Sequence, residues 1–184
     1  GCRGGHPAYC ATWLVRNLVA GARDDGSATL SRDGTPLGGH FFGQSSFAEY
    51  ALADEAGVVR VDDAADLTVL APLGCGVLTG FGTVWNVLRP APGSTLAVFG
   101  TGAVGLASVM AAAQLPLVEI IAIDLVRERL DTAREFGAAH AIGAGSEDIA
   151  TRLAEITGGR GIDAAVDTTG SPKVLRAAVD ALAT

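Results

Sequence analysis

Residues 95–124, TLAVFGTGAVGLASVMAAAQLPLVEIIAID, decide the fold that this chain can adopt. They contain, in order, an apolar strand, a glycine-rich turn, an apolar helix, a second apolar strand and a terminal carboxylate. Within the turn, Gly100 permits a tight bend, Gly102 lets the backbone approach a phosphate, and Gly105 lets helix and strand pack closely. The N-terminus of the following helix offers unpaired N–H groups to an anion. The stretch therefore predicts a dinucleotide-binding turn, with an ordinary glycine-rich turn between strand and helix as the alternative.

The acid that ends this stretch predicts which dinucleotide is bound. Asp124 lies about 20 residues beyond the glycine turn, where a carboxylate accepts hydrogen bonds from the adenosine ribose hydroxyls. A carboxylate at this position repels the 2′-phosphate of NADP. Leu125 and Val126 bring no positive charge to offset this repulsion, although Arg127 and Arg129 follow closely. We therefore expect NAD as the cofactor.

The segments after the glycine turn alternate between strand and helix patterns, as the crossover connections of a parallel sheet require. The strands are expected at residues 95–99, 119–124, 140–142 and 164–168, and the helices at about 103–114, 127–136, 148–157 and 172–182. The last helix has Ser171 as its expected N-cap and Pro172 at its first position. The predicted fold class is α/β, a doubly wound Rossmann-type parallel sheet that lacks about two strands at its C-terminal end.

The residues before the sheet have a different composition. Residues 1–39 are rich in Gly, Asp, Arg and Ser and predict a loop-dominated region. Strands are expected within residues 41–52 and 58–61, and a mostly apolar helix with glycine breaks from about residue 67 to 88. Because the chain begins inside a Cys- and Gly-rich motif and stops directly after a helix, we expect it to be a fragment with material missing at both ends.

The composition excludes several classes of partner. Of the 184 residues, 49% are hydrophobic and 18% are charged, and the net charge is −7, which argues against binding to nucleic acid or an anionic membrane. The uncharged stretches 67–88 and 90–118 are long enough to span a membrane, but Gly, Pro, Thr and Asn interrupt both, so no insertion is expected. Three cysteines form no closed disulfide framework, and no secretory signal pattern begins the chain, so we expect a cytoplasmic protein.

The cysteines are the candidate metal ligands. Cys2 and Cys10 form a C-x7-C pair in a glycine-rich segment, where two thiolates could be half of a tetrahedral four-cysteine zinc site. Two unrelated loop cysteines explain that spacing equally well. Cys75 lies between glycines ahead of a helix, and a buried structural cysteine is the alternative there. The histidines match no ligand pattern and are expected in surface or capping positions: His6, His40 and His140.

Taken in order, these motifs resemble the zinc-dependent medium-chain alcohol dehydrogenases, and among them the aryl (benzyl) alcohol dehydrogenases. The resemblance covers essentially the whole chain. Five motifs resemble, in order, the structural-zinc loop, the end of the catalytic domain, the segment with a catalytic zinc ligand, the NAD site, and a later strand beside the cofactor. The matching motifs are CRGGHPAYC at 2–10, FFGQSSFAEYAL at 41–52, PLGCGVLTGFGTVWN at 72–86, FGTGAVGL at 99–106 with the strand ending at Asp124, and VDTTG at 166–170.

The resemblance implies two domains and an activity. Residues 1–75 would be the C-terminal part of a β-rich GroES-like catalytic domain, and residues 76–184 a truncated NAD-binding Rossmann domain. The intact protein would oxidise a primary alcohol, aryl or benzyl in class, to the aldehyde. Zinc would act as a Lewis acid on the alcohol oxygen while the nicotinamide accepts a hydride. The intact protein is expected to be a homo-oligomer whose other partner is the small-molecule alcohol or aldehyde.

The resemblance also implies the metal ligands. Cys75 would be one of three catalytic zinc ligands, and Cys2 and Cys10 two of the four ligands of the structural zinc. In the family the remaining ligands and the proton-relay residues precede the structural-zinc loop. The chain by itself is therefore expected to hold neither zinc firmly and to be inactive.

Five further residues would contact or line the cofactor site, besides the glycines and the acid described above. Thr79 would face the nicotinamide and Val104 would back its ring. Arg129 would reach the adenosine ribose. Thr168 and Thr169 would line the cofactor cleft, with a purely turn-forming role as the alternative.

Two other functions remain open at this point. One is a zinc-free NAD(P)-binding module without redox turnover. The other is a zinc-free quinone or enoyl reductase of the same superfamily, although the three cysteines argue against it because such chemistry needs no thiolate ligands.

Overall fold

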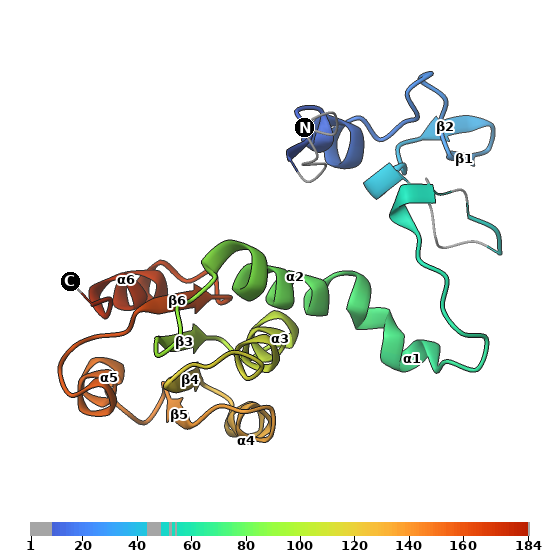
Figure 1. Cartoon of the computed structure of the whole chain (residues 1–184). Helices are drawn as coiled ribbons and strands as arrows, with labels where there is room; N and C mark the ends of the chain where they lie inside the picture. Colours follow the sequence, from blue (N-terminus) through green and yellow to red (C-terminus); the bar gives the residue numbers. More distant parts are fainter. Residues whose placement is uncertain (1–8, 44–48, 52, 54, 184) are drawn as a thin grey trace. The chain divides into compact units, whose positions relative to one another are not determined.

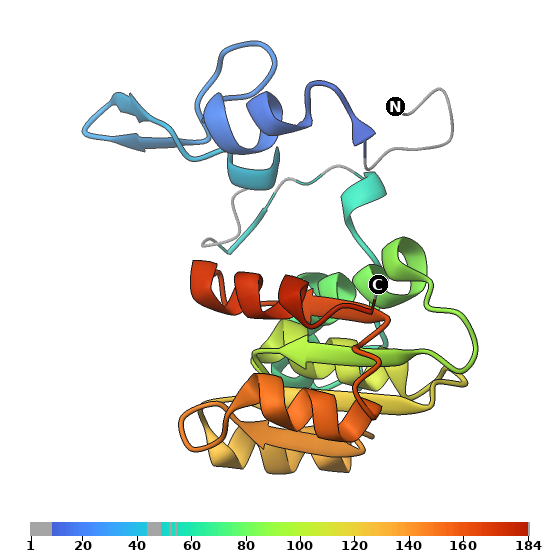
Figure 2. The same cartoon turned by 90° about the vertical axis from the view of Figure 1, so that its left-hand side faces the viewer.

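The structure is a computed structural model that describes residues 9–43, 49–51, 53 and 55–183 of the chain. The backbone contacts divide the chain into two compact units, Gly1–Ala64 and Ala65–Thr184. Figures 1 and 2 show the elements of each unit.

Four parallel strands form the centre of the second unit (Figure 1). They are β3 (Thr95–Phe99), β4 (Glu119–Asp124), β5 (His140–Gly143) and β6 (Ala164–Asp167). Their order across the sheet is β5-β4-β3-β6. From β3 the chain winds outward through β4 to β5 and then crosses to β6 on the other side. The carboxyl ends of β3 and β6 therefore flank the topological switch point, where ligands bind in open α/β sheets.

Helices cover both faces of this sheet, as Figure 2 shows. The helices are α3 (Ala103–Ala112), α4 (Arg127–Glu135), α5 (Ile149–Thr157) and α6 (Pro172–Asp180). Side chains of β3 alternate between two apolar clusters: Leu96 and Val98 lie in the cluster that contains α3 and α4 residues, while Ala97 and Phe99 lie in the cluster with α5 and α6 residues. The doubly wound parallel sheet predicted from the sequence is confirmed.

A broken helical segment precedes the sheet. It consists of α1 (Leu67–Leu70), the 3-10 turn η6 (Ala71–Gly74), α2 (Gly76–Gly82) and the π-helical η7 (Thr83–Leu88). The break falls at Cys75, whose φ of −134° and ψ of −79° are not helical. No single helix among the described residues is long and apolar enough to cross a membrane. The bent pair Leu67–Gly74 and Gly76–Leu88 meets the length and composition requirement only as a pair.

The first unit differs from the sequence prediction. The region 1–39, predicted as loops, contains the antiparallel hairpin of β1 (Leu30–Arg32) and β2 (Thr35–Leu37). Its two-residue turn is Asp33-Gly34, with φ values of 50° and 77°, as the commonest hairpin turns require. The remaining described elements of this unit are the π-helical η3 (Val15–Val19) and the 3-10 turns η4 (Phe41–Gly43) and η5 (Glu55–Gly57).

The strands predicted in residues 41–52 and 58–61 were wrong where the structure describes them. Residues 41–43 form η4, in which Phe42 has the left-handed φ of 53°, and residues 58–61 have no regular structure. Apolar side chains favour a strand only where a sheet buries them, and here Phe41 and Val59 are exposed. Residues 44–48 and 52 lie outside the described part. The assignment of residues 1–75 to a GroES-like domain stays a prediction, and the contact boundary falls between Ala64 and Ala65.

Candidate cofactor-binding site

Two glycines of the predicted turn occupy positions that exclude any side chain. Gly100 has a φ of +85°, and a Cβ there would lie 2.6 Å from Thr168 Oγ1. Its N–H donates to the carbonyl of Ile123 at 2.8 Å, which ties the turn to β4. A Cβ on Gly105 would lie 1.9 Å from the Gly100 carbonyl oxygen. Both positions therefore favour glycine, as the sequence pattern predicted: Gly100 because of its positive φ and the adjacent Thr168 side chain, and Gly105 because a Cβ there would collide with backbone.

The middle glycine faces open space. A Cβ on Gly102 would meet nothing within 4 Å, and the residue is the N-cap of α3 without a side-chain capping hydrogen bond. The first N–H groups of a helix have no intrahelical acceptors, and the helix dipole favours an anion there. Open space in front of the ten-residue helix α3 at the switch point fits a pyrophosphate.

Asp124 ends β4 beside the turn and is held by three hydrogen bonds. The backbone N–H and the hydroxyl of Thr101 both donate to its Oδ2, at 2.6 and 2.9 Å, and the N–H of Val126 donates to Oδ1 at 2.8 Å. Burial raises the pKa of the Asp124 carboxyl, but these hydrogen bonds and the charge of Arg129 outweigh it and hold the pKa below its ordinary value. Asp124 is therefore an ionised acceptor at the edge of the candidate pyrophosphate site.

The two threonines expected to line the cleft lie after β6, across the switch point from β4. Thr168 Oγ1 contacts the carbonyl oxygens of Phe99 and Gly100 at 3.2 and 3.0 Å, so its single hydroxyl proton ties the glycine turn to β6. The N–H and hydroxyl of Thr169 both donate to Asp167 Oδ1, at 2.9 and 2.7 Å. Both hydroxyls thus hold the local turns together. Contact between either side chain and the cofactor stays a prediction.

The segment with Cys75 and Thr79 packs against the start of α3. Cys75 is exposed at the break before α2, and its carbonyl accepts from the N–H of Thr79 at 2.8 Å, one helical turn on. A Cβ on Gly76 would lie 3.2 Å from the Ala103 Cβ, and one on Gly80 would lie 2.5 Å from the Val104 carbonyl oxygen. The two glycines therefore let α2 lie directly on the first turn of α3. This brings the predicted zinc ligand and the predicted nicotinamide contacts to one end of the sheet.

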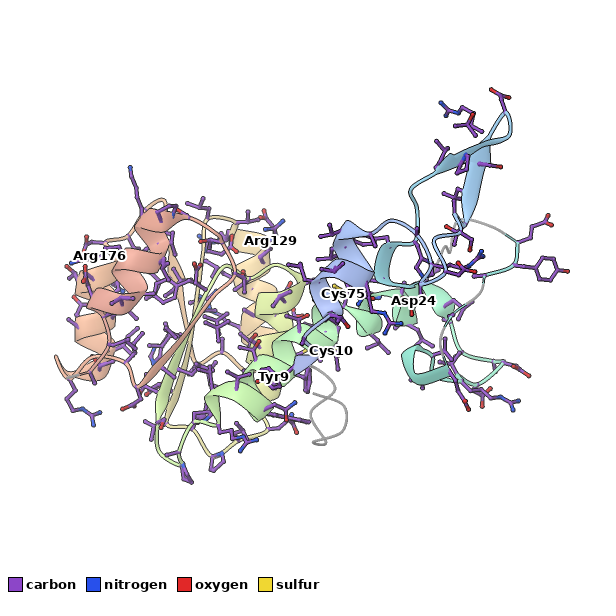
Figure 3. The ribbon with its side chains drawn as sticks, turned by 90° about the horizontal axis from the view of Figure 1, so that it is seen from above. Tyr9, Cys10, Asp24, Cys75, Arg129 and Arg176 are labelled. Carbon is purple, nitrogen blue, oxygen red and sulfur yellow. The ribbon has the colours of Figure 1, made fainter. Side chains whose placement is uncertain are left out.

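Two further predicted residues lie on the helices around the turn. Val104 is half-buried in the first turn of α3, where its carbonyl oxygen accepts from the buried hydroxyl of Ser108 at 2.9 Å. Arg129 is exposed on α4, and its charge is close enough to lower the pKa of Asp124 (Figure 3). Both lie where a cofactor bound at the glycine turn would extend, and their roles stay predictions.

The metal ligands are not brought together in the described part of the chain. Within residues 9–43, 49–51, 53 and 55–183 there is no group of three or more His, Cys, Asp or Glu side chains that could hold a metal ion. Cys2 lies outside those residues, and Cys10 and Cys75 belong to different units. Cys75 is an exposed thiol that could serve as one ligand, but the described residues do not form a zinc site by themselves.

The histidines have no common role. His140 Nε2 lies 2.9 Å from Glu119 Oε2 at the start of β5, while the Nδ1 atom of His40 is buried and has no hydrogen-bond partner among the described residues. His6 lies outside the described residues.

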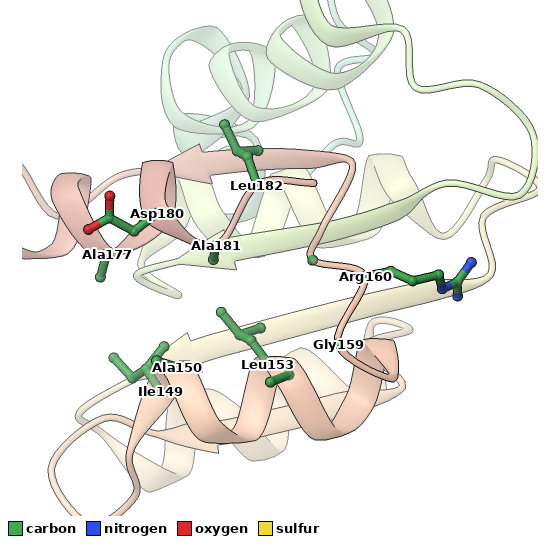
Figure 4. Close-up of a pocket in the computed structure, with 11 residues that line it drawn as sticks. Ile149, Ala150, Leu153, Gly159, Arg160, Ala177, Asp180, Ala181 and Leu182 are labelled. Carbon is green, nitrogen blue, oxygen red and sulfur yellow. The ribbon is translucent and has the colours of Figure 1, made fainter. Parts of the chain in front are cut away.

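The second unit also has a groove away from the glycine turn, shown in Figure 4. It has a volume of about 420 Å³ and lies between α5 and α6, beside Arg160 and Asp180. None of the predicted site residues lines it. It lies near the beginning of β6 rather than the carboxyl ends of the strands, where open α/β sheets bind their ligands.

Thr101 is a residue of this site that the sequence did not predict. This residue is fully buried, and it supplies two of the three hydrogen bonds that hold Asp124. Its position between the first two glycines of the turn, preceding an acid that ends the next strand, was the only signal available.

Comparison with known proteins agrees with this geometry. Residues 103–184 match the family model described as zinc-binding dehydrogenase. The geraniol dehydrogenase of Castellaniella defragrans is 39% identical over 179 residues, which make up 97% of this chain and 48% of that protein.

Two solved structures resemble nearly the whole chain. The alcohol dehydrogenase zinc-binding domain protein from Burkholderia ambifaria is 48% identical with a TM-score of 0.88, covering 98% of this chain and 49% of that one. Benzyl alcohol dehydrogenase from Acinetobacter calcoaceticus is 40% identical with a TM-score of 0.87, covering 99% and 48%. The chain thus spans about half the length of these relatives. Residues 103–184 thus match a zinc-binding dehydrogenase model, and the chain is similar in sequence and fold to alcohol dehydrogenases over about half of their length.

Proposed function

We propose that this protein is an NAD-dependent zinc alcohol dehydrogenase that oxidises a primary alcohol of the aryl or benzyl class to the aldehyde. One observation carries the cofactor part of the proposal: Asp124 is held as an ionised acceptor beside the open N-terminus of α3. An adenosine ribose needs such an acceptor, and a pyrophosphate needs such an anion site. The homology to alcohol dehydrogenases supports the reaction class.

In this proposal each part of the candidate site binds one part of NAD. The first turn of α3 and the open space at Gly102 receive the pyrophosphate, and Asp124 accepts from a ribose hydroxyl with Arg129 nearby. Val104 and Thr79 lie on the two helices that meet beyond the turn and would hold the nicotinamide. Positioning the ring in this way is the main contribution of the chain to hydride transfer.

The zinc part of the proposal rests on Cys75 and on the family. Cys75 would be one thiolate ligand of a catalytic zinc, with the other ligands supplied outside the described residues, and Cys2 and Cys10 would bind a structural zinc. Bound zinc would supply Lewis-acid polarisation of the alcohol oxygen, and NAD would accept the hydride. The thiol of Cys75 is exposed, so no side chain has to move before a metal can reach it.

The substrate class rests on two relatives. One is named a geraniol dehydrogenase and another a benzyl alcohol dehydrogenase. Geraniol and benzyl alcohol are both primary alcohols whose carbinol carbon adjoins a double bond or an aromatic ring. We propose a substrate of this kind, for a cytoplasmic homo-oligomeric enzyme that binds neither nucleic acid nor membrane.

The test is an assay of the purified full-length protein with measured zinc content. NADH formation is followed with benzyl alcohol, geraniol and a saturated secondary alcohol, each with NAD and with NADP. We expect NADH formation with the first two alcohols, and its loss in a Cys75→Ser variant that still binds NAD. Stoichiometric NAD binding without any metal would instead favour a nucleotide-binding module. Bound zinc without turnover of either primary alcohol would contradict the proposed activity.

A further inference from the structure

Thr101 is a fully buried polar residue inside the glycine turn, between Gly100 and Gly102. Its N–H and its hydroxyl both donate to the same atom, Asp124 Oδ2, at 2.6 and 2.9 Å. The two residues lie on different elements and are brought together only by the parallel pairing of β3 with β4. Two donors on one oxygen restrict rotation of the carboxylate in a way that a single donor does not.

The hydrogen bonds leave a defined part of Asp124 free. An ionised carboxylate offers about four acceptor positions. Thr101 fills two on Oδ2 and the N–H of Val126 fills one on Oδ1, so the open acceptor position lies on Oδ1. The side that remains available for a ribose hydroxyl is thus set by Thr101 and Val126.

We propose that Thr101 is a positioning residue that orients the Asp124 carboxylate for the adenosine ribose and couples that acceptor to the phosphate-binding turn. The inference rests on the proposed function in one respect, that the site binds an adenine nucleotide. Thr101 itself is buried and need not touch the ribose, so its effect passes through Asp124. Because its N–H belongs to the turn, a shift of the turn also shifts the carboxylate.

A role limited to stability makes a different prediction. If Thr101 only satisfied its own buried groups, its loss would affect every ligand of the site equally. If it orients Asp124, its loss affects only ligands with ribose hydroxyls. ADP and 2′,3′-dideoxy-ADP differ only in those hydroxyls, so comparing them separates the two roles.

The experiment measures binding of both nucleotides to the full-length protein by calorimetry. Thr101→Val keeps the shape of the side chain and removes the hydroxyl, and Thr101→Ser keeps the hydroxyl as the matched control. We expect Thr101→Val to weaken ADP binding about tenfold, the effect of one hydrogen bond to a charged group, and to leave dideoxy-ADP within about twofold. Thr101→Ser should stay within about twofold of the wild type for ADP.

Equal weakening of both nucleotides by Thr101→Val, or no weakening of either, would overturn the inference. Failure of the wild-type protein to bind NAD and ADP would overturn both the proposed function and this inference. Binding by the wild type together with equal effects of Thr101→Val on both nucleotides would overturn the inference alone. Should Thr101→Val not fold, a crystal structure of the wild type with ADP decides. Thr101 must then keep both hydrogen bonds to Oδ2 while Oδ1 meets the ribose, and a hydroxyl turned away from Asp124 would contradict the proposal.

Discussion

At the scale of single residues, Asp124 is the group on which the proposed preference for NAD depends. The acid was predicted from its place at the end of an apolar strand, and the structure adds the three hydrogen bonds that hold it. Thr101 could not be predicted, because its role depends on a contact between the glycine turn and the end of β4 rather than on a spacing within one element. No pattern in the sequence distinguishes a threonine that is required in a glycine turn from one that is merely tolerated there.

The lowered pKa of Asp124 predicts a pH dependence of stability. A carboxyl whose folded-state pKa lies below its ordinary value of 3.8 stabilises the fold above that pH, and the contribution is lost as the pH falls through the folded-state pKa. We expect Asp124→Asn to lower the free energy of unfolding at neutral pH, with the difference from wild type shrinking as the pH falls below 3.8. Urea unfolding of both proteins at neutral pH and at pH values below 3.8 measures this. A difference that is the same at every pH would contradict the assigned hydrogen bonds.

At the scale of elements, the predicted bounds were exact for the fully buried strands, and the prediction failed for the exposed segments of the first unit. The bounds of β3 and β4 were predicted at every residue, because both strands are buried on both faces and end at glycine or a carboxylate. The hairpin β1–β2 was missed because its residues are exposed, which removes the alternating pattern, although Asp33-Gly34 is a strong turn signal. The strand patterns at 41–43 and 58–61 were misleading because no sheet buries those residues in the described part of the chain.

The glycine turn gives a prediction with a matched control. In Gly105→Ala the new Cβ would lie 1.9 Å from the Gly100 carbonyl oxygen, so helix α3 must move away from β3. We expect a loss of about 2 kcal/mol or more in unfolding free energy, together with loss of NAD binding. In Gly102→Ala the new Cβ meets nothing within 4 Å, so stability should be nearly unchanged while NAD binding weakens, because the methyl group occupies the phosphate position. Thermal unfolding and NAD titration of both variants measure these effects, and unchanged NAD binding in Gly102→Ala would contradict the pyrophosphate assignment.

The packing of α2 on α3 predicts different stabilities for another pair of glycine-to-alanine variants. A Cβ on Gly80 would lie 2.5 Å from the Val104 carbonyl oxygen, whereas the nearest atom to a Cβ on Gly82 is 3.8 Å away. Gly80→Ala should therefore destabilise the unit by about 1–3 kcal/mol through overpacking. Gly82→Ala, at a helical residue, should stabilise it by up to about 1 kcal/mol through helix propensity. Denaturant unfolding of the two variants compares them, and equal effects would show that α2 does not lie on α3 as described.

At the scale of the whole molecule, the alternation of strands and helices predicted a doubly wound parallel sheet, and the structure adds its strand order, β5-β4-β3-β6. The end of the described chain adds a feature that the helix pattern did not show. After α6 a parallel bridge joins Leu182 to Ile162, and the N–H of Ala183 donates to the Ile162 carbonyl at 2.9 Å. The relatives are about twice as long as this chain, and catalysis by zinc is therefore a proposal about the whole protein.

The most direct test of the cofactor site is the relative affinity of the full-length protein for NAD and NADP. With Asp124 ionised and held beside the turn, we predict that NAD binds at least about tenfold more tightly than NADP, because the carboxylate accepts from the free 2′-hydroxyl and repels a 2′-phosphate. Asp124→Ala should remove most of this preference by weakening NAD more than NADP. Calorimetric titration of both proteins with both cofactors measures the four affinities. Equal affinities for NAD and NADP in the wild type, or equal losses for both cofactors in Asp124→Ala, would contradict the account.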